Sequence, residues 1–124
     1  MVWLAFLQIV IIVVNIAGFK TYLVYGHTIL GLVILGLAHY NSMQIKGTKA
    51  PNRLKRIAKS TASLATIQII LGIILFLNVV LSIGIPLVGV IAFLHLGAAL
   101  AIITQASSVA TAYDMWEEKE YTSS

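Results

Sequence analysis

The sequence contains no cysteine and few acidic side chains. Without cysteine the chain has no disulfide, no thiolate metal site and no thioether attachment for a c-type haem, so any metal or haem must be bound through nitrogen or oxygen. All four acids follow Tyr113, within residues 114–120. Because no carboxylate precedes Asp114 to act as a general acid or base, we expect no independent catalytic activity.

Charge of either sign is also scarce. Charged residues make up 10% of the 124 residues and hydrophobic residues 60%, whereas soluble domains carry roughly 25% charged residues. The composition therefore indicates an integral, multi-pass protein of the cell membrane. Six of the eight basic residues lie between Lys46 and Lys59, as in a cytoplasmic loop of a membrane protein. The net charge of +4 is explained by this loop, and we expect no nucleic-acid partner.

Four apolar stretches take up most of the chain. A hydrocarbon core about 30 Å thick needs about 20 residues of helix. The stretches that meet or approach this length cover about residues 2–18, 22–43, 61–83 and 87–110. The sequence therefore predicts an all-α integral membrane protein, a four-transmembrane-helix bundle that forms a single membrane domain over residues 1–124.

The connectors predict which side of the membrane each end faces. Residues 44–60 form a polar, basic connector and residues 111–124 a charged tail. By the positive-inside rule the basic connector faces the cytoplasm, and with four spans both termini do so too. The connectors that contain Lys20 and Gly84 then face outside. We expect Gly84 to end the third helix and Pro86 to occupy the first turn of the fourth.

Histidines are the most informative polar residues in these stretches, because polar groups in hydrocarbon are costly. Counted from the outer side, His27 lies about 9 Å into the second helix and His95 about 13 Å into the fourth, and these helices run in the same direction. Two imidazoles at similar depth can bind one iron from opposite faces, so we predict haem b with His27 and His95 as axial ligands. His39 lies about 18 Å beyond His27 and is expected at the interface. The alternative is that each buried histidine hydrogen-bonds a neighbouring helix.

Four further polar residues are candidates for supporting contacts to the haem: Lys20, Tyr25, Gln68 and Asn78. Lys20 is the only charge predicted outside and suits a haem propionate. Gln68 lies one helical turn from Gly72 on the third helix, and on the fourth helix Ala98 and Ala99 lie beside His95, which leaves the kind of gap that a planar macrocycle needs. The same patterns are also typical of interfacial caps, interhelical hydrogen bonds and ordinary close helix packing.

Two short segments, Ile67–Gly72 in the third helix and Phe93–Leu100 in the fourth, resemble the haem A synthase family. In that family a four-helix bundle occurs twice, and each copy has one haem-ligating histidine near the start of its second helix and one in its fourth. The resemblance covers about residues 22–108, or one half-unit of the family. It implies haem ligation by His27 and His95.

The chain also departs from the family pattern. The catalytic half of the family has a glutamate one turn before the histidine, whereas residues 22–26 contain no acid here. The cysteines found in an outer loop of many members are absent too. The resemblance therefore implies the cofactor-binding half without the catalytic half.

Three functions remain open from the sequence. The first is a haem b-binding membrane subunit for electron transfer or assembly within a larger respiratory or oxidase complex. The second is a haem-free structural accessory subunit of a membrane oxidoreductase, such as a terminal oxidase or a copper monooxygenase. The third is a half-size haem A synthase. The expected partners are membrane lipid and either other membrane subunits or further copies of this chain.

Overall fold

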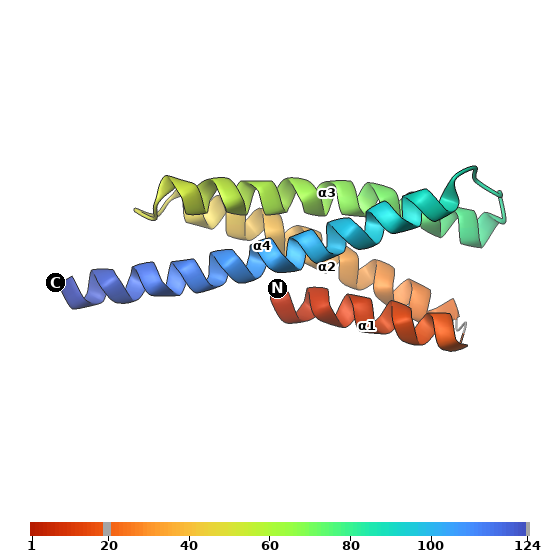
Figure 1. Ribbon diagram of the computed structural model, residues 1–124, viewed down its shortest axis with the longest axis horizontal. Coiled ribbons are helices and arrows are strands. Elements are labelled where there is room, and N and C mark those ends of the chain that lie inside the picture. Colours follow the sequence, from red (N-terminus) through yellow and green to blue (C-terminus); the bar gives the residue numbers. More distant parts are fainter. Residues whose placement is uncertain (19–20, 124) are drawn as a thin grey trace.

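The chain folds into a bundle of helices in the computed structural model (Figure 1). The structure describes residues 1–18 and 21–123, and for residues 12–18 and 21 the backbone alone. The helices are α1 (Val2–Gly18), α2 (Thr21–Lys46), α3 (Asn52–Leu81) and α4 (Val88–Ser123). The described residues form no strand, so the all-α prediction is confirmed.

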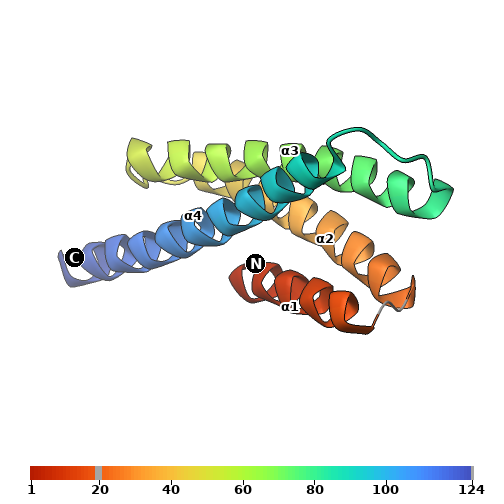
Figure 2. The same ribbon diagram turned by 45° about the vertical axis from the view of Figure 1, so that its right-hand side comes forward.

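Three of these helices, α2, α3 and α4, are long and apolar enough to cross a membrane, which indicates a membrane protein. The 30 residues of α3 extend about 45 Å and the 36 residues of α4 about 54 Å, both longer than a hydrocarbon core of about 30 Å. The 17 residues of α1 extend only about 26 Å. Consecutive helices run in alternating directions, and the C-terminal part of α4 projects beyond the rest of the bundle (Figures 1 and 2).

Three helices, α2, α3 and α4, extend further than the predicted spans. The α2–α3 connector occupies residues 47–51 instead of 44–60, and α4 continues through the predicted tail as far as Ser123. Hydropathy detects only the part of a helix that lies in hydrocarbon, whereas packing stabilises the rest. In the first turns of α3, Leu54 and Ala58 are buried in a cluster that includes side chains of α4.

The turn between α3 and α4 also differs from the prediction. The third helix ends at Leu81, and Ser82 forms its left-handed C-cap with φ 50° and ψ 39°. Gly84 does not end the helix but has φ +68° within the connector, where glycine avoids the penalty of a side chain. Pro86 lies before α4 rather than in its first turn, because that helix begins at Val88.

The helices are arranged as a ring in the order α1, α2, α3, α4, with α4 also contacting α1. Helices α2 and α4 are therefore diagonal, and in the described part of the chain no Cα atom of one lies within 8 Å of a Cα atom of the other. The main core cluster between α2, α3 and α4 consists largely of alanine: Ala38, Ala62, Ala65 and Ile102. Such small side chains allow helices to approach closely in a membrane.

Candidate functional site

The histidines of the diagonal helices meet inside the ring. The ring centroids of His27 on α2 and His95 on α4 lie 6.1 Å apart, and the ring planes are inclined by 66°. Both side chains are half-buried. The structure thus brings together the two histidines for which the sequence indicates a similar depth.

His27 is oriented by α1. Its Nδ1 atom lies 3.3 Å from the backbone carbonyl oxygen of Gln8. Because a carbonyl oxygen only accepts hydrogen bonds, Nδ1 carries the proton and donates it, and Nε2 keeps a lone pair. A ring N–H bonded to a backbone carbonyl is the usual arrangement for a histidine that binds a metal through its other nitrogen.

The sequence indicates Gln8 as a polar residue within an apolar stretch but assigns it no role, whereas the structure places its backbone carbonyl against His27. Gln8 is the first amide side chain in an otherwise apolar stretch, and such a residue within a membrane helix is a signal of function. A Cβ atom at position 31 of α2 would lie 3.1 Å from Gln8 Nε2, so Gly31 provides the space for this amide.

His95 lies against α3. Its Nε2 atom is 3.4 Å from Nε2 of Gln68. Because an amide nitrogen only donates, His95 Nε2 accepts this hydrogen bond and the unpartnered Nδ1 carries the proton. A Cβ atom at position 72 would lie 3.1 Å from Cε1 of His95, so glycine is what allows the imidazole to approach the α3 backbone. Gln68 and Gly72, which the sequence places one turn apart, therefore both adjoin His95.

Three buried polar atoms have no hydrogen-bond partner among the described residues, and they belong to His95 and to two residues that contact the pair: Gln8 Oε1, Gln68 Oε1 and His95 Nδ1. An unsatisfied buried polar group costs about 1–3 kcal/mol, and in native structures such groups are concentrated where a protein has a functional reason to keep them. These are all the unpartnered buried side-chain atoms of the described chain, and each belongs to a residue that contacts or forms the histidine pair.

The other predicted supporting residues have separate contacts. Tyr25 is exposed and packs edge-on against Phe76, with ring centroids 5.7 Å apart. Asn78 Oδ1 accepts a hydrogen bond of 2.8 Å from the backbone N–H of Ile85, which links the end of α3 to the following connector. Lys20 lies outside the described residues.

His39 is apart from this pair. It lies twelve residues beyond His27 on α2, a separation of about 18 Å along the helix. Its Nε2 atom is 3.0 Å from the hydroxyl oxygen of Thr66 on α3, and the side chain is exposed. The interaction gives His39 a contact between helices.

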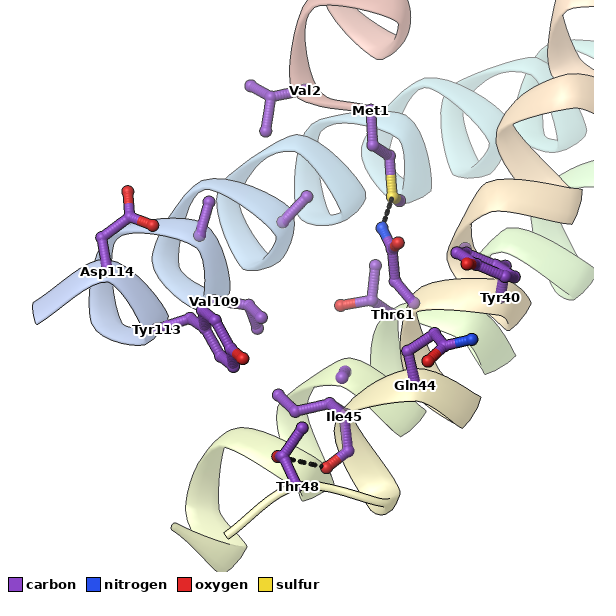
Figure 3. Close-up of a pocket in the computed structure, with 15 residues that line it drawn as sticks. Met1, Val2, Tyr40, Gln44, Ile45, Thr48, Thr61, Val109, Tyr113 and Asp114 are labelled. Carbon is purple, nitrogen blue, oxygen red and sulfur yellow. Dashed lines mark hydrogen bonds between the residues drawn. The ribbon is translucent and has the colours of Figure 1, made fainter. Parts of the chain in front are cut away.

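A groove of about 460 Å³ lies near the other end of the bundle, beside the start of α1. Met1, Thr61 and Tyr113 are among the residues that line it, as Figure 3 shows. Much of the lining is aliphatic, and Asp114 is the only acid in it. The groove includes none of the histidines, so the histidine pair is the stronger candidate for chemistry.

The donor set of the pair fits a haem better than a bare metal ion. Within the described residues no three His, Cys, Asp or Glu side chains are grouped as metal ligands, whereas a transition metal usually takes three or four protein ligands. A haem brings its own four nitrogens and needs only axial ligands. Two imidazoles on opposite sides of one iron have ring centres about 6 Å apart, because metal–nitrogen bonds are about 2 Å and each ring adds its radius. The 6.1 Å between the ring centroids agrees with this spacing, and it is equally the separation of two rings in direct edge-on contact.

Comparisons of the chain with protein-family models, curated proteins and solved structures found no significant match. The resemblance to the haem A synthase family therefore rests on the short segments 67–72 and 93–100. The function is inferred from the site.

Proposed function

We propose that this chain is a haem b-binding membrane subunit that transfers electrons or supports assembly within a larger respiratory or oxidase complex. The observation that carries the proposal is the histidine pair. His27 and His95 come from diagonal helices, and their ring centroids are 6.1 Å apart, so both residues would be close enough to hold one haem iron.

Each residue of the site has a defined task in this proposal. The Gln8 carbonyl keeps the proton of His27 on Nδ1, so Nε2 would hold the iron of a bound haem. For His95 to hold the iron, the Gln68 amide would turn so that its unpartnered Oε1 accepts a hydrogen bond from His95 Nε2, which would leave Nδ1 with a free lone pair. Gly72 provides the space for the His95 ring beside α3. A bound haem supplies a one-electron redox couple, and the apolar helices around it exclude water.

The proposal includes a topology of four membrane crossings with both termini in the cytoplasm. It is supported by the six basic residues between Lys46 and Lys59 and by the alternating directions of the helices. In this arrangement α1 crosses the membrane as the shortest helix, and local bilayer thinning accommodates it.

A second function, that of a haem-free accessory subunit, is favoured by a different observation. Both histidines already have a polar neighbour on an adjacent helix, His27 the Gln8 carbonyl and His95 the Gln68 amide, as expected for buried histidines that only join helices. Many large apolar side chains are also exposed, Leu87 and Phe93 by 75% and 74%, and they are available to contact larger subunits.

A reduced-minus-oxidised absorption spectrum decides between these functions. The protein is expressed with a cleavable tag in its native membrane and purified with its partners. We expect the spectrum of a six-coordinate low-spin haem b. His27→Ala and His95→Ala should each abolish the haem or make it five-coordinate, because an axial position is left without a ligand.

His39→Ala is the matched control, since it removes an imidazole that contacts Thr66 instead of the pair. It should leave the spectrum unchanged. A folded wild-type preparation without a Soret band from this chain would contradict haem binding and favour the haem-free subunit. Equal haem loss in all three variants would show that the ligands are assigned wrongly.

A further inference from the structure

A second, basic pocket lies where α2 ends and α3 begins, about 28 Å along α2 from His27. It is open and has a volume of about 460 Å³. The residues that line it are Lys46, Asn52, Lys55, Arg56 and Lys59. Four of these five side chains are cationic, and neither histidine of the proposed haem site is among them.

The convergence of these side chains results from the fold. Residues at positions 52, 55, 56 and 59 are three or four apart, so they share one face of α3. The Nζ atom of Lys55 donates hydrogen bonds to the backbone carbonyls of Lys46, at 3.3 Å, and Thr48, at 2.7 Å. These bonds hold the C-terminal end of α2 against the first turns of α3 and so bring Lys46 to the basic face.

The remaining cations of the pocket have no countercharge within the part of the chain that the structure describes. Among the described residues Lys46, Arg56 and Lys59 make no ion pair or side-chain hydrogen bond through their charged groups. The acids of the chain are confined to residues 114–120, near the projecting end of α4 (Figure 1). An unneutralised group of Lys and Arg attracts an anion from outside the chain.

The position of the pocket along α3 indicates the source of that anion. From Thr61 to Leu81 the helix carries no charge, and these residues extend about 30 Å, the thickness of a hydrocarbon core. Arg56 and Lys59 lie within the two turns before Thr61. In a membrane they are therefore at the level of the lipid headgroups.

We propose that this pocket binds the phosphate of one anionic phospholipid headgroup through Lys46, Arg56 and Lys59. Arginine recognises phosphate through two parallel hydrogen bonds, and lysine contributes a mobile point charge. The general surface charge of a cytoplasmic loop explains the sign of these residues but not their convergence on one face. The site does not depend on the presence of haem.

The test measures lipid retention by native mass spectrometry. The protein is purified in detergent and mixed with equal amounts of phosphatidylglycerol and phosphatidylcholine. We expect one phosphatidylglycerol to stay bound to the wild type. In Arg56→Gln with Lys59→Gln, retention should be about thirtyfold weaker, because each cation near an anionic headgroup contributes roughly fivefold.

Lys49→Gln with Arg53→Gln is the matched control, since it removes the same charge from the same connector region outside the pocket. It should reduce retention by less than about threefold. Circular dichroism of both double variants verifies that the helices are intact. Arg56→Lys keeps the charge, so it should retain most of the bound lipid. Its retention tests the site if a double variant folds poorly.

Three results would overturn the proposal. Equal losses in the two double variants would mean that only the general surface charge attracts lipid. Displacement of the lipid by inorganic phosphate at similar concentration would identify a free-anion site. A dimer that dissociates only in the Arg56 and Lys59 variant would show that the pocket binds the acidic α4 end of a second copy.

Discussion

Replacing Gly72 by alanine tests the contact between His95 and α3. The new Cβ atom would lie 3.1 Å from Cε1 of His95, whereas carbon atoms pack best at about 3.5–4.0 Å. The imidazole must therefore move by a few tenths of an ångström. Overpacking of this kind costs about 1–3 kcal/mol, and alanine regains up to about 1 kcal/mol through its higher helix propensity. The free energy of unfolding of the haem-free protein should fall by up to about 2 kcal/mol.

The same displacement moves the proposed axial ligand. If the overpacking cost of about 1–3 kcal/mol opposes the position of the ring that binds haem, the affinity for haem should fall about 5- to 150-fold. The assay is a titration of the haem-free protein with haemin, followed at the Soret band, alongside thermal unfolding of the same preparation.

Gly36→Ala is the control, because a Cβ atom there meets nothing within 4 Å. It should leave haem affinity unchanged and raise stability by up to about 1 kcal/mol. If Gly72→Ala behaves like this control in both measurements, His95 does not lie against α3 and the reasoning is refuted. If stability falls while haem affinity is kept, the contact is right and His95 is not the ligand.

Three further outcomes are expected from the membrane topology and the α3–α4 turn. Since the chain has no cysteine, single cysteines introduced at Thr48 and Ser82 should be labelled from opposite sides of the membrane. If an impermeant reagent applied outside modifies position 48 first, the proposed orientation is wrong. Asn78→Ala should lower thermal stability by about 1 kcal/mol because the 2.8 Å bond to the Ile85 N–H is lost, and an unchanged unfolding midpoint would contradict that bond. Gly84→Ala should destabilise by about 1–2 kcal/mol, because φ there is +68°, and a neutral effect on the same unfolding curve would show that the connector adopts another conformation.

The prediction of the fold from the sequence succeeded for helical content and failed at helix ends. Apolar runs identify membrane helices because the window that determines insertion is local. The start of α3 at Asn52 depends instead on packing of Leu54 and Ala58 against residues distant in sequence. Ser82 adopts the left-handed conformation that ends α3, although glycine is the usual residue at such a position. The amino-acid composition alone does not indicate that a serine ends this helix.

For the site, the sequence by itself determined which side chains are polar within the apolar helices and about how deep each lies, since depth follows from counting residues at a fixed rise. For this reason the sequence predicts that His27 and His95 form a pair and that His39 lies apart from them. Only the tertiary structure decided that the Gln8 carbonyl accepts a hydrogen bond from His27 and that Gly72 adjoins His95. Those contacts depend on how each helix is rotated about its own axis. With apolar residues on nearly every face of these helices, hydropathy does not determine that rotation, whereas packing among all four helices does.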